Sequence, residues 1–304
     1  MGEAMVATRP TALVAFVVGS IGIATFSGMD AVMKGLVIAL GIYATMLWRM
    51  LAGVVMAGAL FAVHPHWPSG STMRIHLFRG CLTYVMAMLF FWGLARVPLA
   101  QAIALAFIAP LIALFLAAAF LRETIGPKTI GASLVAFAGV ILIFIGQAQA
   151  DLGRDALLGS IAILISAICY AVNIILMRSQ AQVAGPIEIA FFQNVIVAVL
   201  LIFSWPLFGG ADLPPTSQWP FVLLAAFLST ASLLLLSWAY ARAEASYLAA
   251  TEYTSFLWAM LLGWLVFGET VSLFTLAGAA LIVAGCILAA RRPQDASPVL
   301  EAAT

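Results

Sequence analysis

The sequence is short of the residues that a water-soluble protein needs on its surface. Only 8% of its 304 residues are charged and 65% are hydrophobic, whereas a soluble domain carries roughly 25% charged residues. Because a protein folded in water must present polar groups outward, this composition excludes an ordinary soluble fold. The net charge of +1 offers no basic or acidic surface, so a nucleic acid is not an expected partner.

Motifs for several kinds of chemistry are also absent. The chain has no Gly-x-x-x-x-Gly-Lys-Ser/Thr phosphate loop, so we do not expect it to hydrolyse ATP. It lacks Gly-x-Ser-x-Gly and His-Glu-x-x-His, and no histidine falls in the core of a hydrophobic run, which argues against an intramembrane enzyme. The three cysteines lie in apolar runs without paired spacing, so we interpret them as small hydrophobic residues. His64, His66 and His76 do not predict a metal site, and no cofactor is expected.

Long hydrophobic runs dominate the chain instead. A helix crosses a bilayer with about 20 apolar residues. Charges, prolines and glycines divide the sequence into ten such segments, at 11–36, 42–63, 75–95, 99–121, 127–147, 157–177, 187–208, 218–240, 246–267 and 272–290. The first segment is too long for the apolar core of a signal peptide, so we interpret it as a retained helix. We therefore predict an all-α membrane protein with ten transmembrane helices and polar tails at 1–10 and 293–304.

The basic residues predict how these helices are oriented. Ten crossings place both termini on one side, together with nine basic residues: Arg9, Arg74, Arg79, Arg122, Lys128, Arg178, Arg242, Arg291 and Arg292. The opposite side receives only Lys34, Arg96 and Arg154. Since cytoplasmic loops carry the excess of lysine and arginine, we expect both termini in the cytoplasm of a cell with a bacterial-type inner membrane.

The two halves of the sequence resemble each other. A shift of 146 residues superimposes identical residues without a gap: Trp92 on Trp238, Ala95 on Ala241, Arg96 on Arg242, Glu123 on Glu269, Thr124 on Thr270, Gly139 on Gly285 and Ile141 on Ile287. We predict two repeats of five helices, at 11–147 and 157–290. Because five is odd, the second repeat enters the membrane from the opposite side, which is an inverted repeat typical of secondary transporters.

The repeated segments carry a resemblance to a known group. The runs PLAQAIALAFIAPLIALFLAAAFLRETIG and ASYLAATEYTSFLWAMLLGWLVFGETVS each lead through a helix to a Glu-Thr pair. Together with the early stretches GMDAVMKG and LWRML, they resemble the drug/metabolite transporter superfamily, in its ten-helix families of two EamA domains. The resemblance implies alternating access without nucleotide hydrolysis, and substrates such as amino acids, nucleosides, vitamins, amines or drugs. The Asp-Ala-x-x-Lys, Trp-Arg and Glu-Tyr-Thr elements are most similar to subgroups assigned to riboflavin or S-adenosylmethionine uptake.

We therefore expect a secondary active transporter for a small organic molecule, with a central cavity between the repeats. A proton gradient or solute exchange would supply the energy. A channel-like facilitator is the alternative, but it needs a symmetric pore lining, and the charges here differ between the halves. An intramembrane enzyme is the weakest alternative because its motifs are absent.

Charges inside the predicted helices are the best candidates for function, because each costs about 2.5–3.5 kcal/mol in a bilayer core. Asp30 and Lys34 are four residues apart on one helix face and are able to pair. Arg49 is expected to reach the same layer from the second helix. This cluster would gate the cavity or contact the substrate; the alternative is a structural salt bridge, with Lys34 snorkelling to the interface.

Glu252 is the second charged candidate. It lies inside the ninth predicted helix with no basic residue within one turn. Such a carboxyl would bind protons or a cationic group of the substrate, although a structural hydrogen bond to a neighbouring helix is also open. Tyr253 would add a hydrogen bond and Trp258 an aromatic wall, with simple packing as the alternative for Trp258.

Uncharged polar residues extend the candidate site. Tyr170, Asn173 and Gln193 lie at membrane depth, where polar groups either bind substrates or hold helices together. Tyr170 occupies the repeat position of Asp30, at an offset of 140 residues, and Gln193 that of Arg49, at an offset of 144. Equivalent positions that face one cavity would produce this correspondence.

Three further positions are assigned mechanical roles. Pro110 frees a backbone carbonyl in the fourth helix, which predicts a hinge beside the cavity. Glu123 and Glu269 follow apolar runs at helix ends, where water is available, so we assign them to helix termination rather than to binding.

Overall fold

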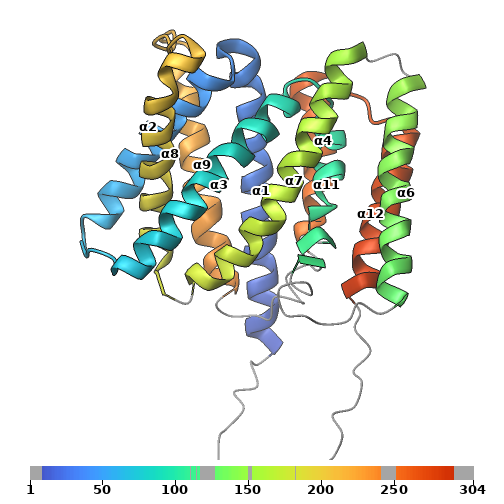
Figure 1. Cartoon of the computed structure of the whole chain (residues 1–304), viewed down its shortest axis with the longest axis horizontal. Helices are drawn as coiled ribbons and strands as arrows, with labels where there is room; N and C mark the ends of the chain where they lie inside the picture. Colours follow the sequence, from blue (N-terminus) through green and yellow to red (C-terminus); the bar gives the residue numbers. More distant parts are fainter. Residues whose placement is uncertain are drawn as a thin grey trace, which may run out of the picture.

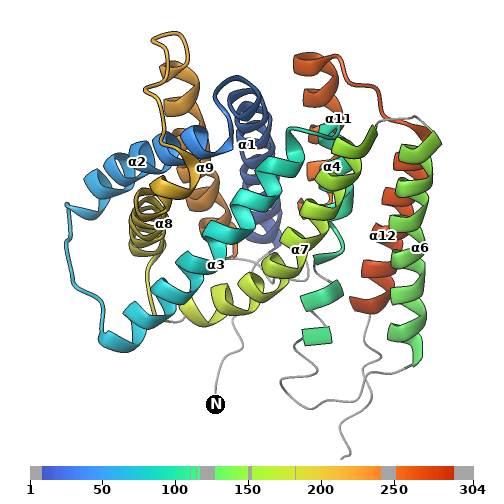
Figure 2. The same ribbon diagram turned by 45° about the horizontal axis from the view of Figure 1, so that its top comes forward.

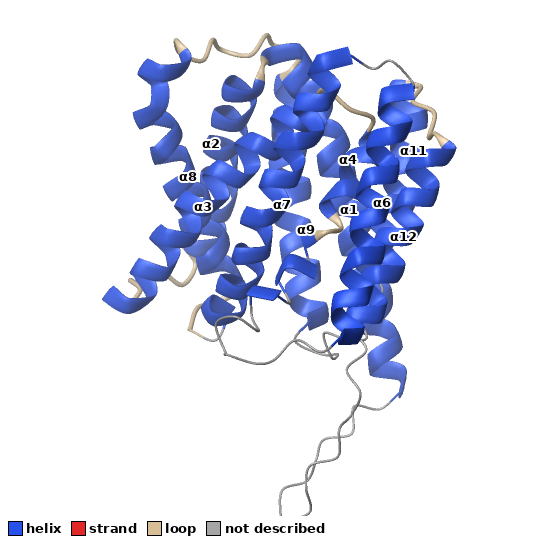
Figure 3. Cartoon of the chain, turned by 45° about the vertical axis from the view of Figure 1, so that its right-hand side comes forward, coloured by secondary structure: helices blue, strands red, loops and turns tan. Residues whose placement is uncertain are grey.

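The computed structural model describes residues 9–109, 111–113, 115–116, 127–149, 153–181, 183–240 and 251–290. Within these residues every regular element is a helix (Figure 3), as the composition predicts. The helices are α1 (Arg9–Leu40), α2 (Ile42–Phe61), α3 (Gly70–Leu94), α4 (Leu99–Ala106), α6 (Pro127–Gln149), α7 (Gly153–Ala181), α8 (Pro186–Phe208), α9 (Trp219–Tyr240), α11 (Thr254–Phe267) and α12 (Leu273–Ala290).

Six of the described segments are long and apolar enough to cross a membrane: Leu13–Leu40, Ile42–Phe61, Gly70–Leu94, Gly153–Met177, Pro186–Phe208 and Trp219–Leu236. Shorter apolar helices occur at Leu99–Ala113, Ser133–Gly146, Thr254–Phe267 and Leu273–Gly285. The start of α1 and the end of α12 lie at the same end of the bundle (Figure 1). The chain is a multi-pass membrane protein.

Local sequence signals determine where the helices begin and end. Gly41 alone separates α1 from α2, and its φ of 79° favours glycine because that residue lacks a Cβ. Ser69 caps α3, since its Oγ accepts the Thr72 N–H at 3.2 Å. With this cap α3 begins at Gly70, five residues before the start predicted for the third segment. The residues of its first turns are therefore part of the helix.

The helices associate in pairs that join the two halves of the sequence. The α1 helix packs against α9, and α3 packs against α7. Further pairs that join the halves are α2 with α8, α4 with α11, and α6 with α12, and α3 also packs against α8, α2 against α9 and α1 against α11. The α6–α12 pair stands at one edge of the bundle in both views (Figures 1 and 2).

Glycines allow α6 and α12 to approach closely. A Cβ atom added to Gly139 would lie 2.5 Å from the carbonyl oxygen of Gly278, and one added to Gly278 would lie 2.6 Å from the carbonyl oxygen of Gly139. The backbones are therefore in contact across this interface, as in other membrane helix pairs with small residues.

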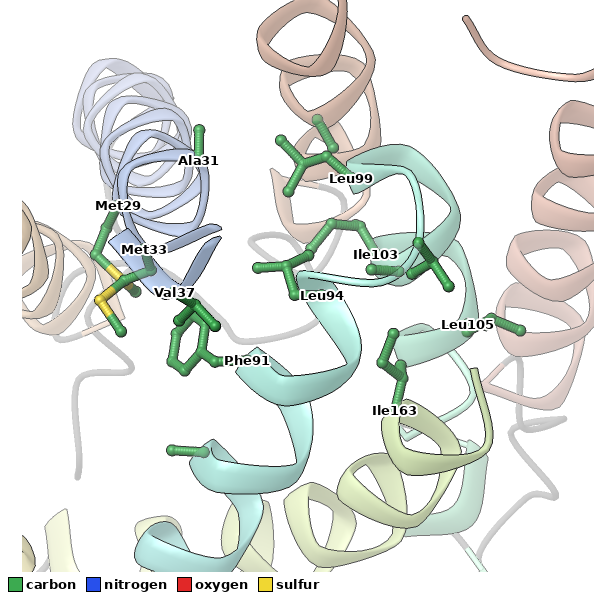
Figure 4. Close-up of a cluster of buried hydrophobic side chains, with 14 of the residues drawn as sticks. Met29, Ala31, Met33, Val37, Phe91, Leu94, Leu99, Ile103, Leu105 and Ile163 are labelled. Atoms are coloured by element: carbon green, nitrogen blue, oxygen red, sulfur yellow. The ribbon is translucent and has the colours of Figure 1, made fainter. Parts of the chain in front are cut away.

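A hydrophobic core lies where α1, α3, α4 and α7 meet (Figure 4). Met33, Leu94, Leu99 and Ile163 each have 0% exposure, and Ile103 has 7%. The short α4 helix packs against α7 and α11.

Candidate substrate-binding site

The helix that begins at Leu99 is interrupted before it has crossed the bundle. The α4 helix ends at Ala106, a turn follows at Phe107 and Ile108, and helical geometry resumes at residue 109. The Ile108 N–H bonds to Leu105, three residues earlier, in place of the usual α-helical partner. Pro110, the predicted hinge, lies outside the described residues.

A second interruption precedes α11. Thr251 and Glu252 are helical, Tyr253 forms a turn, and α11 starts at Thr254, so the segment predicted at 246–267 is not one continuous helix. The Thr254 Oγ1 donates to the Thr251 carbonyl at 2.6 Å, and the Ser255 Oγ donates to the Glu252 carbonyl at 2.6 Å. Hydroxyl groups that bond to the nearby backbone in this way compete with the helical hydrogen bonds.

The two interruptions contact each other. The ring centroids of Phe107 and Tyr253 are 5.5 Å apart in an edge-on arrangement. These residues are 146 positions apart in the sequence, which is the offset of the predicted repeat. The backbone is therefore irregular at one place in the bundle, to which both halves contribute.

Asp30 and Arg49 share a buried layer, as their spacing predicts. Asp30 is 1% exposed and Arg49 is 8% exposed, and the two lie within electrostatic range of each other. The Arg49 Nη2 donates to the Ser229 Oγ at 2.8 Å. The Asp30 Oδ1 and the Arg49 Nε have no hydrogen-bond partner within the described part of the chain. An acidic and a basic side chain are thus buried together without a direct hydrogen bond between them.

Lys34 pairs with Glu269 and not with Asp30, so the predicted pairing is wrong. Its ammonium group forms an ion pair with the Glu269 carboxylate and donates to the Val97 carbonyl at 2.6 Å. The same carboxylate accepts the Leu99 N–H at 2.7 Å. Lys34 is 3% exposed and does not snorkel, because the packing of α1 against α11 places a carboxylate beside it. Glu269 thus links helix ends, in agreement with its assigned structural role; Glu123 lies outside the described residues.

Tyr170 interacts electrostatically with ionisable groups from both halves of the sequence. Its side chain lies within electrostatic range of Glu252, Arg79 and Asp30, which belong to three different segments. Although these groups surround it, Tyr170 is still 37% exposed. Tyr170, Asp30 and Glu252 are predicted site residues, and Arg79, expected on the cytoplasmic side from the distribution of basic residues, joins them.

Arg79 is held by two amide side chains of α7. Its Nε donates to the Asn173 Oδ1 at 3.0 Å, and its Nη1 donates to the Gln180 Oε1. Arg79, Asn173 and Gln180 are 5%, 4% and 1% exposed. Asn173 therefore contributes to the candidate site indirectly, by holding the Arg79 side chain in place.

The hydrogen bonds continue from Gln180 to the loop between α2 and α3. The Gln180 Nε2 pairs with the His76 Nδ1 at 2.6 Å, and the His76 Nε2 pairs with the Glu188 Oε1 at 3.0 Å. The other carboxylate oxygen of Glu188 lies 2.7 Å from the His66 Nε2. We name these residues, with Arg79 and Asn173, the His66–Asn173 chain. It runs from an exposed loop to the centre of the bundle and joins the two halves.

The sequence that folds into this helical bundle matches a known family. The sequence matches the EamA-like transporter family over residues 13–145 and again over 157–291. The chain belongs to this family. A solved structure with 20% identity superimposes with a TM-score of 0.58, over 94% of this chain and 100% of the other, and shares the fold.

Several curated relatives of this EamA protein are transporters. It is 26% identical over 269 residues to the pseudopaline exporter CntI of Pseudomonas aeruginosa, which covers 88% of this chain and 92% of the relative. It is 29% identical over 239 residues to a riboflavin transporter of Rhizobium johnstonii, covering 76% and 73%. It is 26% identical over 211 residues to an S-adenosylmethionine uptake transporter of Rickettsia bellii, covering 69% of each. The EamA protein is therefore a transporter and not an enzyme.

The His66–Asn173 chain was missed at the sequence level, although a signal exists. The polar residues Thr72, His76, Arg79 and Thr83 follow one another at spacings of four, three and four and are all buried, so they form one face of α3. A polar face on an otherwise apolar helix indicates protein neighbours rather than lipid. The two histidines of the His66–Asn173 chain do not form a metal site, because no group of three His, Cys, Asp or Glu side chains suited to a metal occurs among the described residues.

Other predicted residues stay apart from this cluster. Trp258 is 37% exposed, and no ring contact joins it to another aromatic side chain of the described chain. Gln193 is half-buried, and its neighbour Asn194 donates to the Ala190 carbonyl at 2.9 Å.

A pH-dependent contact at the end of the His66–Asn173 chain gives the first prediction. Hydrogen bonds to the Glu188 carboxylate and to the His64 carbonyl raise the pKa of His66 above its ordinary value of about 6.5. A raised pKa means that the contact stabilises fully below about pH 6.5 and is lost as the pH rises through the folded-state value. We expect His66→Gln to lower the melting temperature at pH 6 and to have little effect at pH 9.

The control for this prediction is His64→Gln, which removes an exposed histidine of the same loop and leaves its backbone carbonyl in place. Melting curves of the three proteins in detergent at both pH values measure the effect. A difference between wild type and His66→Gln that is equal at pH 6 and pH 9 would show that the ionised contact with Glu188 does not form.

Proposed function

We propose that this protein is a secondary active transporter that moves a small organic metabolite or drug across a bacterial inner membrane by alternating access. One observation carries the proposal: Tyr170 of the second half lies within electrostatic range of Asp30 and Arg79 from the first half and of Glu252 from its own half. Charged side chains at membrane depth are energetically costly, so they usually bind a substrate or an ion or pair with another polar group.

The proposed architecture has ten spans in two inverted repeats, 11–147 and 157–290. Its support is the pattern of helix pairs. A two-fold axis that exchanges α1 with α7 and α3 with α9 turns the α1–α9 pair into the α7–α3 pair, and both pairs are observed. The pairs α2–α8, α4–α11 and α6–α12 would each be mapped onto themselves. Phe107 and Tyr253 contact each other, as equivalent residues near such an axis would.

The substrate cavity is proposed to lie between the halves at the two helix interruptions. Arg49 is seven residues inside α2 and Arg79 nine residues inside α3, or about 10 and 14 Å from opposite ends of the bundle at 1.5 Å per residue. The layer between them is therefore near the bilayer midplane. Broken helices near the midplane supply substrate sites in many secondary transporters.

The relatives and Glu252 support the proposed substrate class and coupling ion. Relatives are named for pseudopaline export and for riboflavin and S-adenosylmethionine uptake, so both directions occur among them. We propose a substrate of the vitamin, nucleoside, amino acid or amine class, with protons as the coupling ion through Glu252. The distribution of basic residues supports cytoplasmic termini.

Counterflow in proteoliposomes tests the carrier mechanism. Radiolabelled riboflavin, S-adenosylmethionine and amino acids are supplied outside vesicles that are preloaded with the same unlabelled compound. A carrier gives a saturable, transient accumulation of label that is stimulated by the internal compound. Flux that increases linearly with concentration, without stimulation from the other side, would favour the channel-like alternative.

Glu252→Gln is the second prediction. Removing the ionisable carboxyl is expected to reduce pH-driven uptake by about tenfold or more, since a hydrogen bond to a charged group contributes about 1.5–3 kcal/mol. The measurement is initial uptake rate between pH 5 and pH 8. Asp155→Asn, which changes an exposed carboxyl in the first turn of α7, is the control. Uptake by Glu252→Gln with the rate and pH profile of wild type would remove Glu252 from the site.

A further inference from the structure

Arg79 is a buried cation without an acidic partner among the described residues. It is 5% exposed and lies about 14 Å along α3 from Gly70. Of the ion pairs found among the described residues, one involves Lys34 and two join histidines to Glu188; none involves Arg79. Its hydrogen bonds go to the neutral amides of Asn173 and Gln180.

The two amides fix the guanidinium but leave most of its donors unused. A guanidinium group has five N–H donors, and the bonds to Asn173 and Gln180 use one on Nε and one on Nη1. No acceptor among the described residues takes a hydrogen from Nη2. Both nitrogens at the tip of the side chain therefore retain donors, and this pair of nitrogens matches the two oxygens of a carboxylate.

The surroundings of Arg79 place these donors at the proposed site. Tyr170 lies within electrostatic range of Arg79 and also of Asp30 and Glu252. Asp30 is itself a buried carboxyl whose Oδ1 has no hydrogen-bond partner in the described chain. Tyr170 thus lies within electrostatic range of an unpartnered carboxyl oxygen and of a guanidinium with unused donors, and a ligand could complete such a site.

We propose that Arg79 binds a carboxylate group of the transported molecule, an assignment that rests on the proposed transport function. Arginine stays charged at any physiological pH, and burying such a charge is costly unless an anion accompanies it. The protein supplies two neutral amides that orient the guanidinium, and the substrate supplies the counter-charge. The His66–Asn173 chain then connects the bound carboxylate to the exposed loop through Gln180, His76 and Glu188.

Matched carboxylates and carboxamides test this assignment on the purified full-length protein. The probes are nicotinate and nicotinamide, benzoate and benzamide, L-leucine and L-leucinamide, and L-glutamate and L-glutamine. A ligand that binds the folded state raises its melting temperature. We expect carboxylates to raise it in wild type and their amides to have no effect. A panel in which no carboxylate raises the melting temperature, or in which amides do so equally, would overturn the assignment.

Arg79→Gln supplies the second arm, with Arg74→Gln as its control because Arg74 is an exposed arginine of the same helix. We expect Arg79→Gln to weaken carboxylate binding about 10- to 100-fold and Arg74→Gln to preserve it. Equal carboxylate affinity in the two variants would overturn the proposal. If Arg79→Gln does not fold, the comparison of carboxylates with amides in wild type decides alone.

Two further outcomes separate this inference from the proposed function. Inorganic phosphate is included because it is also an oxyanion; a response to phosphate without any response to carboxylates would overturn the carboxylate assignment. Carboxylate binding that depends on Arg79 without counterflow would retain the Arg79 site and contradict the carrier mechanism. Counterflow of a neutral compound with equal rates in wild type and Arg79→Gln would retain the carrier and remove the Arg79 site.

Discussion

Replacing Glu269 with glutamine is expected to lower the free energy of unfolding by about 3 kcal/mol, the low end of the range for breaking a buried ion pair by removing one partner. The cost arises because Lys34, at 3% exposure, would keep its charge without a counter-ion. The backbone contact at Leu99 survives, since a glutamine oxygen can still accept that N–H. The loss is therefore attributable to the ion pair.

The double variant Lys34→Met with Glu269→Gln is the control for this assignment. It removes both charges and fills the space of the lysine stem with an apolar side chain of similar length, so we expect it to melt above Glu269→Gln alone. Thermal melting and the yield of folded protein in detergent measure both effects. A Glu269→Gln protein that melts like wild type would contradict a buried Lys34–Glu269 pair, and a stable but inactive one would give Glu269 a role in transport.

Features that depend on nearby residues were predictable from the sequence. Hydrophobic runs locate the helices because length and polarity alone decide whether a segment can cross a membrane. The common layer of Asp30 and Arg49 followed from the short connection between α1 and α2.

Features that depend on distant residues were not predictable in the same way. The spacing of Asp30 and Lys34 allowed an ion pair on one helix. Helix packing instead places Glu269, which is 235 positions away in the sequence, beside Lys34. The third segment was expected to begin at residue 75, and Arg79 was placed with the basic residues of its cytoplasmic side. Once Ser69 caps the helix, Arg79 is two and a half turns inside it, at about 3.6 residues per turn.

The same long-range contacts suggest how the proposed transport cycle is controlled. The Lys34–Glu269 pair joins α1 to the segment after α11 at one end of the bundle. The His66–Asn173 chain joins α3 to α7 and α8 toward the other end. Each connects the first half to the second. In an alternating-access cycle the two sets would be released in turn, and His66, Glu188 and Lys34 are then the side chains whose bonds must break and re-form.

The α6–α12 pair is expected to behave as a fixed unit in that cycle, and Gly139→Ala tests its packing. A Cβ at residue 139 would meet the carbonyl oxygen of Gly278 at 2.5 Å, a backbone atom that cannot rotate away. The helices must separate, so we expect a loss of about 1–3 kcal/mol in the free energy of unfolding, the usual cost of overpacking. Thermal melting in detergent measures the loss.

Gly131→Ala is the matched control, because it places the same methyl group on α6 at a position with no atom within 4 Å. Alanine favours the helix over glycine by about 1 kcal/mol, so this variant is expected to melt at or above the wild-type temperature. The two substitutions therefore shift stability in opposite directions although their chemistry is identical. If Gly139→Ala were as stable as Gly131→Ala, the two backbones would not be in contact, and α6 and α12 would be free to move independently in the transport cycle.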